Sequence, residues 1–204
     1  MEVARTSKAI SLCQRKYCLE LLEDAGLTSC KPASTPLDPS MRLSQDGGPP
    51  YTDITAYMRL VGRLLYLTTT RLDIAFATQQ LSQLMSCPTE THHKAALRVL
   101  RYLKRSPGRG LFFPQYADLQ IFGFSDADWG GCMDTIRSIF GYCFFIGSSL
   151  VSWKSKKQPT VSCSSAEPEY RALASATREL QWMCFLLSDL HQVPSRLPVL
   201  YCDN

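Results

Sequence analysis

The period of the apolar residues changes along the chain. Between Thr52 and Lys104 apolar positions recur three and four residues apart, as in "TAYMRLVGRLLYL", which predicts amphipathic helices. After Gly110, short aromatic and β-branched runs separated by glycines are typical of antiparallel strands. A long helix is expected at 165–187, followed by a last strand, "PVLYC". The predicted order from residue 117 is therefore β-β-β-α-β.

The N-terminal part carries a different set of signals. Residues 1–13 predict a strand pair that turns near "TSK", and "QRKYCLELLEDAGL" predicts a helix ended by Gly26. Residues 31–50 hold five prolines and two glycines, so we expect an extended linker without a core of its own. Two domains are predicted, at 1–110 and at 117–204: a mostly helical α+β part and then an α/β domain with a mixed sheet.

Composition narrows the class of protein. The chain has 204 residues, of which 45% are apolar and 20% charged, as in soluble globular proteins. No apolar run has the length of a membrane span and no secretory signal precedes the first strand, so we expect no membrane partner. The nine cysteines form no CxxC pair, which favours free thiols in a reducing intracellular compartment. The pair His92–His93 is interpreted as an exposed helix start.

Basic residues are concentrated in two places although the net charge is only +4. The predicted helix that ends near residue 105 carries a cationic stripe opposite an apolar face, and a second group follows the tryptophan of "WKSKKQP". Both groups indicate an anionic partner such as nucleic acid. They comprise Lys94, Arg98, Arg101, Lys104 and Arg105, and then Lys154, Lys156 and Lys157.

Acidic residues stand at the ends of three predicted elements. Asp126 and Asp128 end one strand, Glu169 lies in the first turn of the long helix, and Asp203 ends the last strand. Carboxylate oxygens are the ligands that Mg²⁺ prefers, and phosphoryl transfer requires charge neutralisation. Residues two apart share one side of a strand, so spacing leaves both Asp126 and Asp128 as candidate ligands.

The long helix distinguishes its two acids. Steps of three and four from Glu169 follow the apolar stripe that must pack on the sheet, so this carboxylate points inward. The same steps from Glu167 reach Arg171 and the wet face, where an ion pair is expected.

These motifs resemble a known family. "FSDADWGG", "GYCFFIGSSLVSWKSKKQPTVS", "SSAEPEYRALASATRELQW" and "LYCDN" look like the ribonuclease H domain of copia-type retrotransposon Pol polyproteins, most closely the plant members. The upstream motifs "CQRKYCLELLEDAGL", "RLVGRLLYLTTTR" and "RVLRYLKRSPGRGL" resemble the thumb and connection of the same polyprotein's reverse transcriptase. The resemblance covers essentially the whole chain.

The resemblance implies a function. Ribonuclease H cleaves the RNA strand of RNA–DNA hybrids with two Mg²⁺ ions, for which Mn²⁺ substitutes. By motif, Asp126, Glu169 and Asp203 are the catalytic metal ligands, with Asp128 as a further candidate, and the two basic groups are the nucleic-acid contacts. The polymerase motif Tyr-x-Asp-Asp does not occur in these residues, so no polymerase activity is expected.

The sequence also departs from the family. Apolar Ile136, Ile139 and Phe140 stand in a predicted turn where polar residues are usual, Cys163 replaces an Arg, and Leu72 replaces a Pro. We expect a domain truncated after its fourth strand, before the fourth carboxylate, with weak or no nuclease activity as an isolated chain. A complementing Pol polypeptide would then supply the missing parts. The alternatives are a non-catalytic nucleic-acid-binding remnant and a decayed reading frame without selected function.

Overall fold

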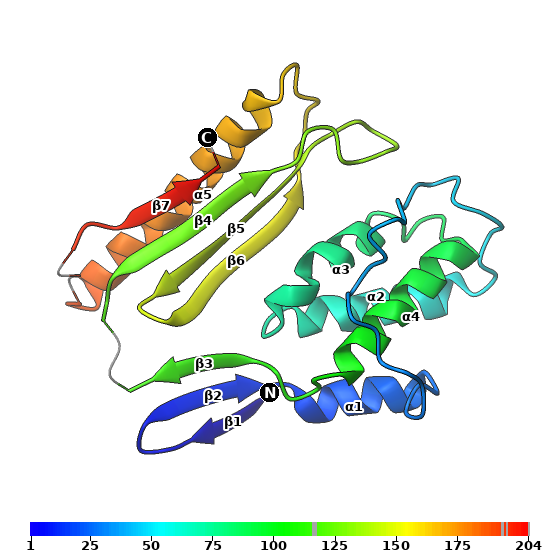
Figure 1. Ribbon diagram of the computed structural model, residues 1–204, viewed down its shortest axis with the longest axis horizontal. Coiled ribbons are helices and arrows are strands. Elements are labelled where there is room, and N and C mark those ends of the chain that lie inside the picture. Colours follow the sequence, from blue (N-terminus) through cyan, green and yellow to red (C-terminus); the bar gives the residue numbers. More distant parts are fainter. Residues whose placement is uncertain (116–117, 193, 195, 204) are drawn as a thin grey trace. The chain divides into compact units, whose positions relative to one another are not determined.

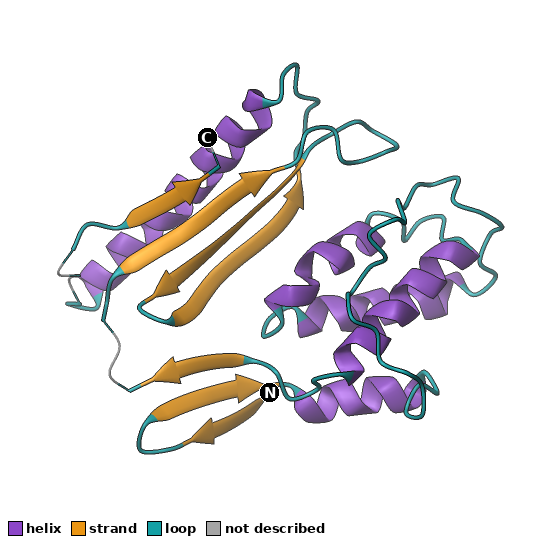
Figure 2. Ribbon diagram, in the orientation of Figure 1, coloured by secondary structure: helices purple, strands orange, loops and turns teal. Residues whose placement is uncertain are grey.

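The computed structural model describes residues 1–115, 118–192, 194 and 196–203, and it is a mixed α/β structure (Figures 1 and 2). The chain divides into two compact units. The first unit comprises Met1–Ala4 and Ser11–Leu111, and the second comprises Arg5–Ile10 and Phe112–Asn204. Of the predicted domain limits, Ala117 and Asn204 lie outside the described residues.

The N-terminal strands and the helices follow the sequence patterns. Two short strands precede the first helix, and a three-stranded sheet has the order β1-β2-β3. The helices of the first unit come next, separated by a segment at 31–50 that holds only an isolated bridge from Pro50 to Thr89. The bounds are β1 Glu2–Arg5, β2 Ala9–Cys13, α1 Arg15–Asp24, α2 Ile54–Leu67, η1 Leu72–Ile74, α3 Ala75–Ser82, α4 Glu90–Lys104 and β3 Leu111–Pro114.

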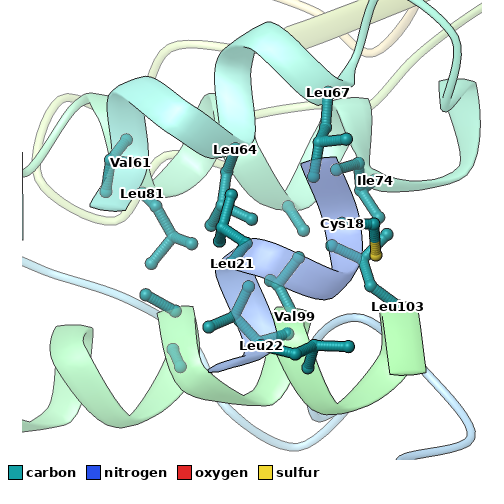
Figure 3. Close-up of a cluster of buried hydrophobic side chains, with 14 of the residues drawn as sticks. Cys18, Leu21, Leu22, Val61, Leu64, Leu67, Ile74, Leu81, Val99 and Leu103 are labelled. Atoms are coloured by element: carbon teal, nitrogen blue, oxygen red, sulfur yellow. The ribbon is translucent and has the colours of Figure 1, made fainter. Parts of the chain in front are cut away.

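The core of the first unit lies among these helices. Figure 3 shows Leu21 and Leu22 of α1 among side chains of α2 and α4, including Leu64 and Val99. The four side chains are at most 2% exposed. The helices therefore bury the apolar faces that their periodicity predicts, which confirms the helical interpretation of residues 52–104.

The second unit is built on a four-stranded sheet of order β6-β5-β4-β7. Its central pair β4–β5 and the pair β5–β6 are antiparallel, whereas β7 is parallel to β4. The sheet is thus mixed and the element order is β-β-β-α-β, as predicted. The bounds are β4 Ile121–Ala127, β5 Ile139–Ile146, β6 Ser149–Lys157, α5 Ala166–Asp189 and β7 Val199–Cys202.

Helix α5 lies along one face of this sheet (Figure 1) and packs mainly against β4 and β5. Its buried residues Ala172, Ala176 and Met183 meet Phe144 and Ile121 of the sheet. Gly123 on β4 faces this core, because a Cβ atom there would lie 2.3 Å from the ring of Phe144. A glycine at this position lets the two strands and the ring approach closely.

Two sequence interpretations are wrong. Ile139 and Phe140 do not lie in a turn: they begin β5 and are 5% and 9% exposed, so their apolar character serves the core. Of the three apolar departures, Ile136 alone lies in the turn, with a left-handed φ of 52°. The second correction concerns His92, which is fully buried rather than exposed.

His92 is built into the start of α4. Its Nδ1 accepts a hydrogen bond from the backbone of Thr89, whose hydroxyl caps the helix, and its Nε2 lies 2.8 Å from the carbonyl of Ser44. The imidazole therefore joins a helix N-terminus to the linker. Within the described residues, no helix combines the length and apolar character needed to cross a lipid bilayer. The nine cysteines are all free thiols.

Candidate functional site

Strand β4 positions Asp126 by simple alternation. Ser125 and Ala127 on either side are buried, whereas Asp126 is exposed on the other side of the strand. Its partner on the neighbouring strand β5 is Gly141, which places no side chain beside the carboxylate of Asp126. Asp126 is therefore available to an external ligand.

Asp128, two residues further, has a different role. Its carboxylate accepts a hydrogen bond of 2.5 Å from the backbone of Ile139 and another from the backbone of Gly131. A Cβ atom at Gly131 would collide with this carboxylate at 1.8 Å. Burial raises the pKa of Asp128, and the charge of Asp126 adds to that effect. This carboxylate fastens the loop after β4, so it is less available as a ligand than Asp126.

Glu169 lies half-buried in the first turn of α5, as the helix-face argument predicts. Its carboxylate accepts a hydrogen bond from the backbone of Ala127 at the end of β4. Burial raises the pKa of Glu169, and the negative charges of Asp126 and Asp203 raise it further. The three acids therefore share one electrostatic environment at this end of the sheet.

Asp203 follows β7 directly. The parallel register pairs Ser125 with Cys202, so the next residues along the two strands are Asp126 and Asp203. Neighbouring strands are about 4.8 Å apart, which brings two like charges to the same end of adjacent strands. This repulsion is of the kind that a bound cation relieves.

The carboxylate of Glu167, by contrast, already has partners within the protein. It forms the expected ion pair with Arg171 one turn later, and it also accepts a 2.6 Å hydrogen bond from the backbone of Cys163. The structure thus separates the two acids of "AEPEY": one secures the helix start, and the other points to the strand ends.

A magnesium site requires oxygen donors close together. The three carboxylates have the appropriate chemistry, since each is a hard oxygen donor. Across residues 1–115, 118–192, 194 and 196–203, however, no three His, Cys, Asp or Glu side chains lie close enough together to hold a metal ion. The donor set fits Mg²⁺ in kind but not in its present spacing.

The basic stripe of α4 is only partly free. Arg98 donates to Thr35 and pairs with Asp38, Arg101 donates to the carbonyl of Lys31, and Lys104 donates to the carbonyl of Cys30. These cations hold the linker against the helix.

Lys94 and Arg105 are exposed at either end of this stripe. The stripe therefore stabilises the first unit with its middle residues and leaves its end residues accessible to solvent.

The lysines of β6 lie on both sides of that strand. Lys154 and Lys156 pair in register with Tyr142 and Phe140 on the face that carries α5, and both are exposed. Lys157 points the other way and donates to the thiol of Cys132. Two of the three lysines thus face α5.

Glu179 is a residue of this region that sequence reasoning missed. Its carboxylate accepts hydrogen bonds from Tyr142 on β5 and Ser152 on β6. Steps of three and four join it to the buried positions Ala176 and Met183. The presence of an acid within the apolar stripe of α5 is the sequence signal that could have identified Glu179.

Comparisons with known proteins identify the family. The retrovirus-related Pol polyprotein from transposon RE1 of Arabidopsis thaliana is 44% identical over all 204 residues. That from transposon TNT 1-94 of Nicotiana tabacum is 34% identical over 98% of the chain. The chain belongs to the retrovirus-related Pol polyprotein family of plant transposons. It spans 14% of the RE1 polyprotein and 15% of the TNT 1-94 polyprotein.

A shorter relative also matches. An uncharacterized mitochondrial protein of Arabidopsis thaliana is 41% identical over 182 residues, which are 89% of this chain and 75% of that protein. No family model matches the chain. No solved structure matches it either.

Proposed function

We propose that the second unit is a ribonuclease H-like nuclease unit of a transposon Pol protein and acts on the RNA strand of RNA–DNA hybrids. The first unit is, in this proposal, a reverse-transcriptase thumb and connection without polymerase activity. The observation that carries the proposal is the convergence of Asp126, Glu169 and Asp203, from β4, α5 and β7, at one end of the sheet.

The chemistry of these groups supports the proposal. Hydrolysis of a phosphodiester needs charge neutralisation at the attacking and leaving oxygens, which two Mg²⁺ or Mn²⁺ ions supply when bound to carboxylates. Asp126 is exposed, and Glu169 is fixed by the hydrogen bond from Ala127. Asp128 is tied to its loop, so the proposal rests on the other three acids.

The basic residues support a polyanionic substrate. Lys154 and Lys156 are exposed on the same unit as the carboxylates, and Lys94 and Arg105 are exposed on the first unit. Contacts with phosphates give affinity without reading sequence, as a hybrid nuclease requires.

Cleavage of a hybrid labelled on its RNA strand tests the proposal. The full chain is purified, its fold is checked by circular dichroism, and product is measured with Mg²⁺ or Mn²⁺. Asp126→Asn should abolish whatever cleavage the wild type shows. Asp189→Asn, which removes an exposed charge at the far end of α5, should not. Equal cleavage by the Asp126→Asn variant would overturn the proposal.

A non-catalytic nucleic-acid-binding protein is the second candidate. The described carboxylates do not form a metal-holding group, whereas exposed cations lie on both units, and this favours binding without chemistry. Salt-dependent binding of the hybrid by a folded chain that never cleaves it supports this candidate. A complementing Pol polypeptide that restores cleavage on mixing would return the nuclease proposal to first place.

A further inference from the structure

A groove separates the edge strand β6 from helix α5 in the second unit. Its volume is about 390 Å³, and its walls come from the end of β6, the following segment and the outer face of α5. Five cations line it: Lys154, Lys156, Lys157, Arg171 and Arg178. Among its described lining residues there is no acid.

We infer that this groove binds the sugar-phosphate backbone of a double-stranded nucleic acid, with Lys154, Lys156 and Arg178 as the phosphate contacts. The inference deepens the function proposed above and rests on its nucleic-acid substrate. Arg178 is the residue that the sequence did not single out, because it lies 21 residues after Lys157, the last residue of the lysine group, on the wet face of α5.

The two walls carry cations at regular intervals. Lys154 and Lys156 share one side of β6, so their Cα atoms lie roughly 6.5 Å apart along the strand. Arg171 and Arg178 are seven residues apart, which is about two turns and roughly 10.5 Å along the helix. Two rows of charge on facing walls suit an extended polyanion better than a single small anion.

Three of the five cations are exposed and form no ion pair with an acidic side chain among the described residues. Arg171 pairs with Glu167, and Lys157 points to Cys132. Within the described part of the chain, Lys154, Lys156 and Arg178 form no ion pair, and all three are exposed. Lys154 is 6.0 Å from the centre of the Tyr142 ring, which holds its stem against the sheet.

Glu179, on the same helix, does not neutralise the groove. Glu179 is half-buried and accepts hydrogen bonds from Tyr142 and Ser152, so its charge is directed into the interface between helix and sheet. The unpaired cations are left to attract a polyanion from solution.

Binding is measured apart from cleavage. A fluorescent RNA–DNA hybrid is titrated with the full chain in EDTA at several KCl concentrations, and anisotropy gives the Kd and its salt dependence. The test variant is Lys156→Gln with Arg178→Gln. The control, Lys8→Gln with Arg196→Gln, removes two exposed charges of the same unit outside the groove. Circular dichroism confirms that both fold.

The groove variant should bind the hybrid roughly tenfold more weakly near 0.1 M salt. The slope of the logarithm of its binding constant against the logarithm of salt concentration should fall in magnitude by about two, because two phosphate contacts are lost. The control should keep the wild-type slope. Equal Kd and slope for the groove and control variants would overturn the inference, as would a folded wild type that binds no hybrid. Groove-dependent binding without any cleavage would support it while the nuclease proposal failed.

Discussion

The hydroxyl of Ser152 on β6 donates a hydrogen bond of 2.7 Å to the carboxylate of Glu179 on α5. Tyr142 on β5 donates a second, of 3.2 Å, so one acid joins the helix to two strands. Burial, followed by the charge of Glu179, raises the pKa of Tyr142 to about 12. This contact fixes α5, and hence both Glu169 and Arg178, on the sheet.

Replacing Glu179 by Ala should destabilise the second unit by about 2 kcal/mol, because a buried donor, Tyr142, and a half-buried donor, Ser152, lose a charged acceptor. Glu179→Gln, which keeps one acceptor oxygen, should cost about half as much. Urea unfolding measures both. In a double-mutant cycle with Ser152→Ala, a coupling energy below about 0.5 kcal/mol would contradict the role assigned to this pair.

Alkaline pH tests the same contact. The folded-state pKa of Tyr142 is raised from 10.0 to about 12, so its contribution to stability is complete below pH 10 and is lost as the pH rises through about 12. Tyr142→Phe has no phenol to ionise. The wild type should therefore lose more stability than this variant between pH 10 and 12, as measured by the urea midpoint. Parallel pH profiles would contradict the raised pKa.

Burial, followed by repulsion from Asp126 and Asp203, predicts the effect of pH on Glu169. Its pKa is raised in the folded state, so the protonated form favours folding below the ordinary value of 4.5, and this advantage is lost as the pH rises through the folded pKa.

Glu169→Gln, which is always neutral, should therefore be more stable than the wild type at pH 7, by roughly 0.5 kcal/mol for the relief of like charges. The difference should shrink toward pH 4. Urea midpoints at both pH values measure it. Magnesium should stabilise the wild type and not the variant if the carboxylates bind it. A variant that is less stable at pH 7 would show that Glu169 contributes more as a hydrogen-bond acceptor than it costs as a charge.

The inward position of Glu169 and the β-β-β-α-β order could be predicted because they depend on local periods of 2 and 3.6 residues. The burial of His92 could not, because the linker that covers it contributes Ser44 from 48 positions earlier.

The basic stripe of α4 shows the same division between what local spacing predicts and what distant contacts decide. Its spacing correctly placed the cations on one face, opposite the buried Val99 and Leu100. Sequence alone could not show that Arg101 and Lys104 bind carbonyls of the linker, since backbone acceptors leave no residue-specific signal. Phe140 shows a further limit: family usage favours a polar residue at this position, whereas the structure follows the β-strand preference of the aromatic run that begins there.

Arg71 should be the most sensitive charged residue of the first unit. It is 2% exposed, donates two hydrogen bonds of 2.8 Å to Asp73, and also donates to the carbonyl of Ser106. Burial alone would raise the pKa of Asp73, but the hydrogen bonds and charge of Arg71 outweigh it and hold that pKa below its usual range.

Arg71→Met should cost about 3 kcal/mol, because it leaves a partly buried acid without its main partner. Arg59→Met, at an exposed position of α2, should change the free energy of unfolding by less than about 0.5 kcal/mol. Chemical denaturation followed by circular dichroism compares them. A loss as small as that of the Arg59 variant would show that the ion pair adds little beyond its own desolvation cost.

Two glycines should respond to alanine in opposite directions. At Gly123 a Cβ atom would lie 2.3 Å from the Phe144 ring, whereas at Gly62, inside α2, it would meet nothing within 4 Å. Gly123→Ala should destabilise the second unit by about 2 kcal/mol through overpacking. Gly62→Ala should stabilise the first unit by up to about 1 kcal/mol through helix propensity. Hydrogen exchange reports on each unit separately, and a uniform response across both units would contradict this assignment of the two glycines to independent cores.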